Sequence, residues 1–362
     1  MWLPPHGSRV VVAMSGGVDS SVTAAWLKHE GYDVIGVSLQ LHDASEQIEN
    51  KYGTCCTLSD IGDARRVAEK IGIPFYVSDM EVEFRTAVID DFLNEYIAGR
   101  TPNPCVQCNE KVKFSRLLDW ALDLGADYLA TGHYALVEKT DRFELHRGVY
   151  PEKDQSYFLF SIRQEDLARC LFPMGGLSKN AVRELAREYG LAVANKPDSQ
   201  EICFVQGRKY QDFVEENVPE TARQPGPIVN EVGELVGEHR GLYNFTIGQR
   251  KGLGVNSLEP LYVTEIDPAL NRVVVGSEAG LFKKRCRVER MHWINGQPDG
   301  RPLKAKIRYR SRESTCRVDL LADSRCEVEF ESAQRAITPG QAIVFYDGSR
   351  VAGGGWIGDL CV

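Results

Sequence analysis

The first half of the chain alternates short apolar runs with amphipathic segments. Residues 8–14 (SRVVVAM) form a continuous, β-branched run, which is typical of a strand buried in a parallel sheet. After a glycine-containing turn, apolar residues recur at helical spacing from Val18 to Trp26 and predict a helix over about 18–30. The alternation continues with predicted strands at 33–41, 74–80 and 127–133 and predicted helices at 59–72, 81–98 and 110–124. It predicts a doubly wound parallel sheet with helices on both faces, a Rossmann-like α/β fold.

The pattern changes near residue 205. Between 206 and 275, glycines and prolines break the chain into short segments, which indicates a small mixed or mostly β module. From about residue 280, polar and apolar positions alternate, and strands are predicted at 303–310, 314–321, 325–331, 341–348 and 350–357. We therefore expect an α/β domain over 1–205, a small central domain over 206–278, and a barrel or sandwich over 279–362.

Composition is that of an ordinary globular protein. The chain has 362 residues, of which 43% are hydrophobic and 26% are charged. No apolar run approaches the ~20 residues that a membrane span needs, and the start MWLPPHGSR lacks the apolar core of a signal peptide. We therefore expect a cytoplasmic protein with no membrane partner. In that reducing compartment, paired cysteines indicate metal binding or transient redox chemistry before structural disulfides.

The charge is unevenly distributed. The net charge is −8, which alone argues against a nucleic-acid partner. Residues 281–312, however, contain eleven Lys or Arg against Glu289 and Asp299, a net charge of +9. Such a run is commonly a solvated face, but basic residues interleaved with Trp293 and Tyr309 also suit contact with phosphates and bases.

Cys105 and Cys108 form a Cys-x-x-Cys pair within TPNPCVQCNEKVKF (residues 101–114), a segment that two prolines make turn-prone. Such a pair can be half of a zinc site, a redox disulfide or the position of a reactive thiolate. The chain has no second Cys-x-x-Cys pair, since the adjacent Cys55 and Cys56 lack the spacing, and histidine is scarce nearby. A zinc site is therefore disfavoured, and the thiol chemistries stay open.

The segment AMSGGVDSS (residues 13–21) follows the first predicted strand and opens the first predicted helix. Gly16 and Gly17 let a phosphate approach the backbone, the serine hydroxyls can add hydrogen bonds, and the helix start supplies N–H groups and a positive dipole. The segment has neither the lysine of a Walker A loop nor the glycine spacing of a GxGxxG fingerprint. It predicts a phosphate-binding loop of a different kind.

In its strand–turn–helix context, SGGVDSS resembles the loop of the PP-loop ATP pyrophosphatases, which split ATP between its α and β phosphates and leave AMP on a substrate oxygen. In such loops Asp19 lies beside the phosphates and is a candidate Mg²⁺ contact; helix N-capping is a second, compatible role. Further motifs occur in order along the chain: GRTPNPCVQCNEKVKF (99–114), ATGHYA (130–135), KDQSYFL (153–159), KPDSQEICFV (196–205), TIGQRKGLG (246–254) and TPGQAIVFYDG (338–348). With these motifs, the chain resembles the bacterial tRNA-specific 2-thiouridylase family over essentially its whole length.

This resemblance implies a PP-loop ATP-binding and catalytic domain, a small central domain and a C-terminal β-barrel that binds tRNA. It implies a sulfurtransferase that uses ATP, with Mg²⁺, to adenylate the C2 oxygen of the wobble uridine and then installs sulfur from a cysteine persulfide. The implied partners are tRNA and a persulfide donor, which is a cysteine desulfurase or a sulfur-relay protein.

Position by position, the resemblance assigns two functional cysteines and two binding sets. Cys108 matches the nucleophilic cysteine, and Cys203 matches the cysteine that carries the persulfide. The ATP-binding set is Ala13, Met14, Ser15, Gly16, Gly17, Val18, Asp19, Ser20, Leu39 and Gly132. The tRNA-contacting set is Asn103, Pro104, Cys105, His133, Lys153, Asp154, Gln155, Arg308, Tyr309 and Gln341. No residue is assigned to a protein-held metal, and the remaining cysteines are expected to be small apolar residues of helices and strands.

Cys105 departs from a well-known form of the family, in which an aspartate considered as a general acid or base occupies this position. Three thiols, Cys105, Cys108 and Cys203, could instead hold a [4Fe–4S] cluster with one open iron that binds sulfide directly. A PP-loop amide or C–N ligase and a metal-stabilised RNA-binding protein are further alternatives. The ligase has no use for the cysteine pair and the basic segment, and the RNA-binding protein leaves SGGVDSS unexplained.

Overall fold

The computed structural model describes residues 2–41, 58–198, 202–205 and 207–358, and the chain divides into two compact units. The first unit comprises residues 1–88, 105–207 and 349–351. The second comprises residues 89–104, 208–348 and 352–362. The chain therefore leaves the first unit before the Cys-x-x-Cys pair and returns to it at Cys105.

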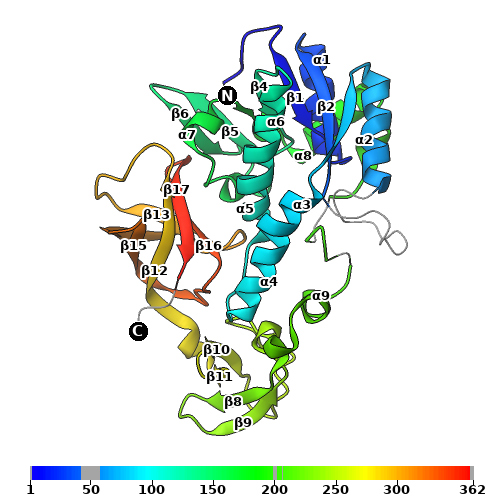
Figure 1. Ribbon diagram of the computed structural model, residues 1–362. Helices are drawn as coiled ribbons and strands as arrows, with labels where there is room; N and C mark the ends of the chain where they lie inside the picture. The colour runs from blue at the N-terminus through cyan, green and yellow to red at the C-terminus, as the bar shows by residue number, and fades with distance from the viewer. Residues whose placement is uncertain (1, 42–57, 199–201, 206, 359–362) are drawn as a thin grey trace. The chain divides into compact units, whose positions relative to one another are not determined.

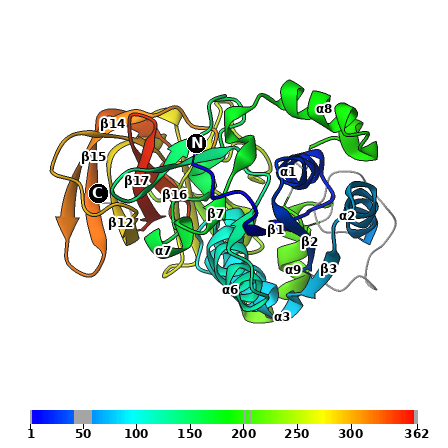
Figure 2. The ribbon, with the colours of Figure 1, turned by 90° about the horizontal axis from the view of Figure 1, so that it is seen from above.

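The first unit contains a parallel sheet with the strand order β3-β2-β1-β4-β7 (Figure 1). Its strands are β1 (Arg9–Ala13), β2 (Asp33–Gln40), β3 (Phe75–Asp79), β4 (Tyr128–Ala130) and β7 (Cys170–Leu171). Figure 2 shows α1 (Val18–His29), α2 (Leu58–Ile71) and α8 (Lys179–Glu188) on one face of the sheet and α6 (Leu118–Asp123) on the other. The predicted doubly wound α/β fold is confirmed.

Burial on both faces explains why β1 is the central strand. Its Val10, Val11 and Val12 are fully buried, and β1 pairs in parallel with β2 on one side and β4 on the other. Because the carboxyl ends of parallel strands meet at one edge, the segments that follow β1, β2 and β4 gather there. The predicted phosphate loop is the segment after β1.

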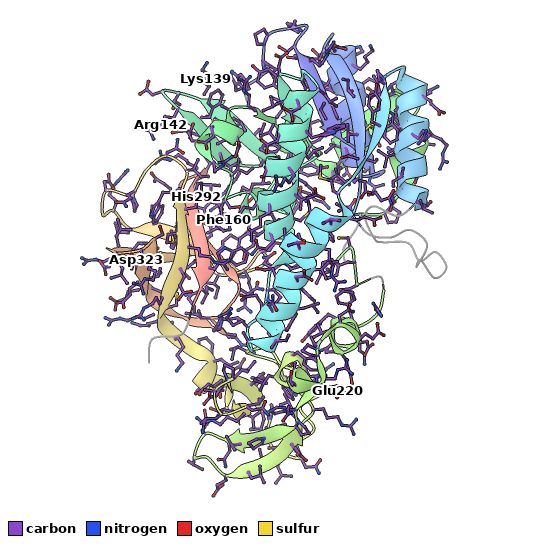
Figure 3. The ribbon with its side chains drawn as sticks, viewed as in Figure 1. Lys139, Arg142, Phe160, Glu220, His292 and Asp323 are labelled. Atoms are coloured by element: carbon purple, nitrogen blue, oxygen red, sulfur yellow. The ribbon has the colours of Figure 1, made fainter. Side chains whose placement is uncertain are left out.

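The sequence patterns above do not predict every element of this unit. β5 (Ala135–Lys139) and β6 (Phe143–Arg147) form an antiparallel hairpin, and Lys139 and Arg142 lie at its tip (Figure 3). The short helix α7 (Gln164–Leu167) follows, and α8 was also missed. The hairpin begins at Ala135, the last residue of the motif ATGHYA, whose first residue, Ala130, ends β4.

The Cys-x-x-Cys pair lies on a helix. α5 (Pro104–Gln107) begins at a proline, whose fixed φ and missing N–H suit the first helical position, and a π-helical segment over Cys108–Leu117 continues into α6. We expected a turn around Cys105 and Cys108 and a helix from residue 110. This expectation was wrong at the start of the helix, which begins at Pro104. The helix predicted at 81–98 is observed as α3 (Glu81–Phe84), a π-helical segment over Arg85–Ile89 and α4 (Asp90–Ile97). Within the described ranges, no helix is long and apolar enough to cross a membrane.

The central part of the second unit is a small sheet with the strand order β10-β11-β8-β9. Its strands are β8 (Gly226–Asn230), β9 (Leu235–His239), β10 (Tyr262–Asp267) and β11 (Arg272–Gly276), and α9 (Tyr210–Asn217) precedes them. α9 packs on α4 through Phe213 against Phe92 and through Tyr210 stacked on Tyr96. The expectation of a small, mostly β module agrees with this arrangement.

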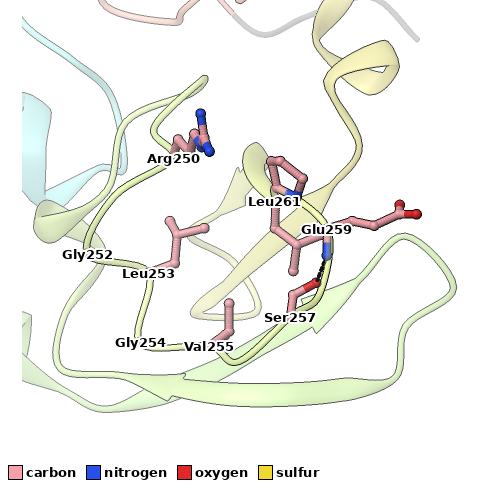
Figure 4. Close-up of a pocket in the computed structure, with 9 residues that line it drawn as sticks. Arg250, Gly252, Leu253, Gly254, Val255, Ser257, Glu259 and Leu261 are labelled. Atoms are coloured by element: carbon pink, nitrogen blue, oxygen red, sulfur yellow. Dashed lines mark hydrogen bonds between the residues drawn. The ribbon is translucent and has the colours of Figure 1, made fainter.

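A pocket in this module is lined by residues between Arg250 and Leu261 (Figure 4). Gly252 and Gly254 have φ of +73° and +71°, values that glycine adopts without steric cost, so the lining segment can turn sharply. Ser257 Oγ accepts a hydrogen bond from Glu259 N at 3.2 Å. The residues that line this pocket include no member of the predicted ATP, sulfur or tRNA sets.

The C-terminal part is a barrel with the strand order β12-β15-β14-β13-β16-β17, closed by pairing of β17 with β12. Its strands are β12 (Phe282–Trp293), β13 (Leu303–Lys306), β14 (Ser314–Leu321), β15 (Arg325–Arg335), β16 (Ala342–Asp347) and β17 (Arg350–Ile357). In Figure 3, the barrel can be located by the labelled residues His292, on β12, and Asp323, in the β14–β15 turn. Cys286, Cys316 and Cys326 are core residues, and burial raises the pKa of Cys316 and Cys326 to about 12. The predicted barrel is confirmed, and these thiols are the small apolar residues that were expected.

The turn before β16 anchors the segment that leads to α5. Thr101 N donates to Pro339 O at 2.9 Å, and Gln341 Nε2 donates to the carbonyl oxygens of Thr101 and Pro102, both at 3.0 Å. Gly340 has φ of +86°, and a Cβ there would lie 2.9 Å from both N and O of Thr101. Glycine is required at this position by conformation and by space.

Gly340→Ala is expected to lower the free energy of unfolding by about 2 kcal/mol or more, because a backbone clash adds to a left-handed strain of about 1–2 kcal/mol. Gly348→Ala is the matched control, since Gly348 has φ of +63° but nothing within 4 Å of its Cβ position. Urea unfolding followed by tryptophan fluorescence measures both variants. If the two variants lost the same free energy of unfolding, the close packing of Gly340 on Thr101 would contribute nothing to stability.

Candidate functional site

The predicted phosphate loop connects β1 to α1. A Cβ on Gly16 would lie 2.2 Å from the carbonyl oxygen of Asp60, and Gly16 has φ of +70°, so any side chain is excluded there. The loop backbone therefore packs directly on the first turn of α2. Ser20 Oγ accepts a hydrogen bond from Ser15 N at 3.1 Å, which folds the loop back on α1. The N-cap of α1 is Gly17, which has no side-chain oxygen to offer the first N–H groups, and this suits binding of an anion.

Other members of the predicted ATP set lie at the same edge of the sheet. Gly132 follows β4, and a Cβ there would lie 2.7 Å from Ser20 N and 2.9 Å from the carbonyl carbon of Asp19. The structure thus places the segment after β4 against the first turn of α1. Leu39 is buried near the end of β2, where it can contribute only apolar packing. The loop residues Ala13, Met14 and Val18 connect or begin the same two elements.

The Asp19 carboxylate of the loop is contacted by two side chains from later parts of the chain. Tyr134 Oη donates to Asp19 Oδ1 at 2.7 Å, and Lys179 Nζ donates to both carboxylate oxygens at 2.8 Å. Lys179 is the first residue of α8 and its side chain is only 13% exposed. Burial, and next the charge of Asp19, raise the pKa of Tyr134 well above its ordinary value, so that this phenol stays a hydrogen-bond donor. A lysine 160 positions further along the chain therefore places its ammonium group beside the loop.

Lys179 also contacts the motif that contains Cys203. Its Nζ lies 2.6 Å from Asp198 Oδ1, while Lys153 Nζ donates to Asp198 Oδ2 at 2.5 Å. Burial alone would raise the pKa of Asp198, but hydrogen bonding to Lys153 and to Lys179 outweighs it and lowers that pKa. Asp198 is therefore a carboxylate at neutral pH, held by two ammonium groups.

Lys196 makes a second connection between the same motif and the loop. Its Nζ donates to Gly16 O at 3.1 Å, to Asp60 Oδ1 at 2.6 Å and to Asp63 Oδ2 at 2.5 Å. Burial would lower the pKa of Lys196, but the two carboxylates raise it overall. The start of the motif KPDSQEICFV is thereby fastened to the phosphate loop and to α2.

Sequence reasoning missed the residues that make these connections. Tyr134, Lys196 and Asp198 lie inside the motifs ATGHYA and KPDSQEICFV, so their position within a motif was an available signal. Lys179 follows Ser178, whose side chain caps α8 by accepting a hydrogen bond from Ala181 N. Ser178 is a sequence signal for the start of α8, but it does not indicate that Lys179 contacts the phosphate loop.

The two predicted functional cysteines lie in different local settings. Cys108 is buried at the start of the π-helical segment, and Cys203 is half-buried in the turn 202–205. Phe204, next to Cys203, packs edge-on against Phe84 of α3 at 5.8 Å, and α3 also contacts the π-helical segment. Both cysteine segments therefore pack on α3. Cys105 is exposed, and in the described residues no group of three or more His, Cys, Asp or Glu side chains is placed to hold a metal ion.

Two members of the predicted tRNA set use their side chains inside the fold. Asp154 is 4% exposed, and its carboxylate accepts hydrogen bonds from Gly148 N, Ser156 N and Ser156 Oγ at 3.0–3.1 Å. Gln155 Oε1 accepts a hydrogen bond from Tyr134 N at 3.1 Å. The Asp154 and Gln155 side chains therefore stabilise the conformation of the loop that contains Lys153.

His133 is half-buried beside two aromatic rings. Its ring centroid lies 5.9 Å from that of Phe114 and 6.0 Å from that of Phe172, and its Nδ1 is 2.7 Å from Thr131 Oγ1. Burial, and next the charge of Lys113, lower the pKa of His133 well below its ordinary value. The imidazole is therefore neutral at physiological pH, so it can offer a hydrogen bond or a stacking face but no positive charge.

In the second unit, the predicted tRNA contacts lie around the turn after β13. The strand ends at Lys306 rather than at 310, and Lys306 Nζ lies 5.7 Å from the ring centroid of Tyr309. Arg308 Nη2 donates to Arg335 O at 2.5 Å. Gln341 is the residue that holds the 101–102 backbone, just ahead of Asn103 and Pro104.

Part of the basic segment is neutralised within the barrel. Arg285 pairs with Glu329 at 2.9 Å, and Arg287 pairs with Glu327 at 3.3 Å, both across β12 and β15. Arg285 and Arg287 therefore have carboxylate partners on β15, so the charge of the segment 281–312 is partly balanced within the barrel.

The chain forms a parallel α/β unit with a glycine loop after its first strand, then a small β module and a closed barrel. Together these parts define a three-part protein of the HUP class. Three family models match the chain in that order. They are described as tRNA methyl transferase HUP domain over residues 8–207, tRNA methyl transferase PRC-barrel domain over 211–277 and aminomethyltransferase beta-barrel domain over 283–357.

Relatives identify the particular family. The tRNA-specific 2-thiouridylase MnmA of Geotalea uraniireducens is 53% identical over 96% of this chain and 94% of its own length. The proteins of the same name from Geobacter metallireducens and Zymomonas mobilis are 51% and 49% identical, each over at least 94% of both chains. The chain belongs to the tRNA-specific 2-thiouridylase family, as its motifs predicted.

Solved structures give a much weaker likeness. A 4-thiouridine synthetase–RNA complex with bound ATP is 16% identical, with a TM-score of 0.35 over 59% of this chain and 51% of that chain. An NMN synthetase from Francisella tularensis is 17% identical, with a TM-score of 0.34 over 59% of this chain and 79% of that chain.

Proposed function

We propose that this chain is a tRNA-uridine 2-sulfurtransferase that activates the C2 oxygen of the wobble uridine with ATP and replaces that oxygen with sulfur. The observation that supports this best is the chain of contacts from the phosphate loop to the Cys203 motif through Lys179 and Asp198. An adenylating site and a sulfur-carrying cysteine must act on one base, and the contacts between the loop and Asp198 at the start of the Cys203 motif support this proposal.

The phosphate loop fits the first half of the reaction. Uridine O2 attacks the α-phosphorus of ATP, the bond to the β-phosphate breaks, and pyrophosphate leaves. Mg²⁺ takes oxygen ligands and commonly binds one or two carboxylates together with substrate phosphates. Asp19, whose carboxylate is 30% exposed beside the loop, fits such an ion. When bound, Mg²⁺ would neutralise phosphate charge; the helix N–H groups and Lys179 add positive charge from the protein.

The cysteines fit the second half. A persulfide on Cys203 attacks C2 through its terminal sulfur, and AMP departs with the original oxygen. The Cys108 thiolate then attacks Cys203 Sγ, which forms a Cys108–Cys203 disulfide and releases the 2-thiouridine. A cellular dithiol restores both thiols, and a cysteine desulfurase or a sulfur-relay protein supplies the next persulfide.

Methyl transfer is the second candidate, because two of the matching family models are described by that activity. A methyl donor already contains its leaving group, so methylation has no need for ATP cleavage beside Asp19. It also has no need for two thiols whose segments share α3. A PP-loop C–N ligase would use the loop but neither the thiols nor a basic barrel. These features favour sulfur transfer.

Asp19→Asn should lower tRNA-dependent pyrophosphate release by about a hundredfold or more, since it removes the carboxylate charge next to the phosphates. The measurement is coupled pyrophosphate detection with ATP and unmodified tRNA, and with the same tRNA after 2-thiolation. Release that is equal with both tRNAs, or undiminished in the variant, would contradict the proposed adenylation. A labelled product that contains a new methyl group would establish the second candidate.

The barrel should bind tRNA mainly through phosphates. Lys306→Ala and Arg308→Ala are each expected to weaken tRNA binding and to reduce the slope of log K against log salt by up to about one unit. Arg285→Ala is the matched control, because Arg285 is paired with Glu329 on the barrel wall and should leave the slope unchanged. Filter binding at several salt concentrations gives the slopes; identical slopes in all variants would remove the turn after β13 from the interface.

Cys105 separates the persulfide route from an iron–sulfur route. Because Cys105 is exposed and outside the proposed disulfide, Cys105→Ser should keep a large part of the thiolation activity, whereas Cys108→Ser and Cys203→Ser should abolish it. The assay is 2-thiouridine by mass spectrometry, with iron analysis of anaerobically purified protein. About four irons per chain, lost together with activity in Cys105→Ser, would replace the persulfide route by the cluster route.

A further inference from the structure

The motif TIGQRKGLG (246–254) lies in the central module and has no role in the function proposed above. Its residues from Arg250 onward line part of the pocket in Figure 4, which has a volume of about 270 Å³. Pockets for whole small molecules commonly measure about 300–1,000 Å³. Because Arg250, Gly252 and Gly254 are exposed, the pocket is also open to solvent. It therefore suits a small group that projects from a larger ligand.

The loop that lines this pocket leaves many hydrogen-bond donors unused. Among the described residues, none accepts a hydrogen bond from a backbone N–H between Arg250 and Asn256. The side chains of Arg250 and Lys251 likewise make no hydrogen bond or ion pair within the described part of the chain. By contrast, Arg272 of the same module pairs with Asp267 at 3.2 Å. A run of N–H groups and two cations is therefore free to bind an anion.

The loop is held in place by contacts that do not use these donors. Leu253 is 6% exposed and belongs to the apolar core of the module. Gln249 Oε1 accepts a hydrogen bond from Thr246 N at 3.0 Å, and Gln249 Nε2 donates to Lys251 O at 3.0 Å. An anion would therefore meet donors whose positions are already set, which lowers the entropy that binding costs.

Glycines at alternate positions shape the backbone of the loop. Gly252 and Gly254 have φ of +73° and +71°, and Leu253 between them has a negative φ. Such a change of sign between neighbouring residues is typical of the concavities in which successive N–H groups bind an anion. In Figure 4, Arg250 lies at the edge of the pocket and the Glu259 side chain extends away from it. The carboxylate of the pocket lining therefore does not occupy the place beside Arg250.

We propose that the loop 249–256 binds a backbone phosphate of tRNA through its free N–H groups and the side chains of Arg250 and Lys251. The proposal rests on tRNA as the substrate of the proposed function, and it adds a contact in the central module. A phosphate group carries the charge that the two cations attract, and its oxygens accept hydrogen bonds from backbone N–H groups. Such a contact positions the RNA without reading its sequence.

Arg250→Gln and Lys251→Gln should each weaken tRNA binding by about threefold to tenfold near physiological salt. Each should also reduce the slope of log K against log salt by up to about one unit. Arg250→Lys keeps the charge and should recover most of the slope. Arg240→Gln is the matched control, because Arg240 is an exposed cation of the same module outside the pocket lining. Its slope should equal that of the wild type, and urea unfolding should give one stability for all four variants and the wild type.

Ethylation interference locates the contact on the RNA. Unmodified tRNA is ethylated sparsely at its phosphates, and the molecules that the full-length protein binds are separated from those that it rejects. The wild type and Arg240→Gln should reject tRNA that is ethylated at the contacted phosphate, whereas Arg250→Gln should accept it. An interference pattern that is the same for the wild type and Arg250→Gln, or a slope that Arg240→Gln lowers equally, would overturn the proposal.

Inorganic phosphate is the second source of the same chemistry. If it raised the Tm of the wild type but not of Arg250→Gln, while both bound tRNA equally well, the loop would bind free phosphate and the assignment to tRNA would be wrong. A wild-type protein that does not bind tRNA at all would instead refute the proposed function itself. Normal tRNA binding by the wild type and by Arg250→Gln would refute only the role of the loop.

Discussion

The ammonium group of Lys196 is the contact on which the arrangement of the site depends. It sits among Gly16 O, Asp60 and Asp63, and the side chains of these two aspartates are 8% and 20% exposed. Without this cation, two partly buried carboxylates would lose their common partner, which destabilises the fold because their charges would no longer be compensated. The backbone of Gly16 touches Asp60, so the same cation fixes the loop against α2 and determines where the chain continues toward Asp198.

The parts of this arrangement that could be predicted from the sequence are local. The β1–loop–α1 unit was predicted because an apolar strand, a glycine turn and a run with apolar residues at helical spacing each leave a pattern within a few residues. Lys179 left none, since its contacts with Asp19 are made across 160 positions of the chain. The start of α5 was mispredicted for a related reason. A proline reads equally well as part of a turn or as the first residue of a helix, and tertiary packing decides between the two.

Motif membership indicated which residues matter but not how. Asp154 and Gln155 lie in a motif assigned to tRNA contact, yet their side chains satisfy backbone groups of the protein. Gln341 similarly holds the backbone of Thr101 and Pro102. These side chains position the segments that carry Lys153 and Asn103. A motif match therefore indicates where a site lies but not which atom performs each task, because side chains that only support the site belong to the motif as well.

The source of the loop's lysine has a consequence for how the site works. In a Walker A loop the lysine belongs to the phosphate loop itself, so its position is set by local backbone geometry. Here Lys179 reaches Asp19 only because α8 packs on α1, with Val182 and Ala186 in the same apolar cluster as Val22. A lysine placed by tertiary packing can have a second partner outside the loop, and Asp198 is that partner. One ammonium group therefore contacts both the phosphate loop and the Cys203 motif, so the packing of α8 on α1 helps to hold these two segments in place.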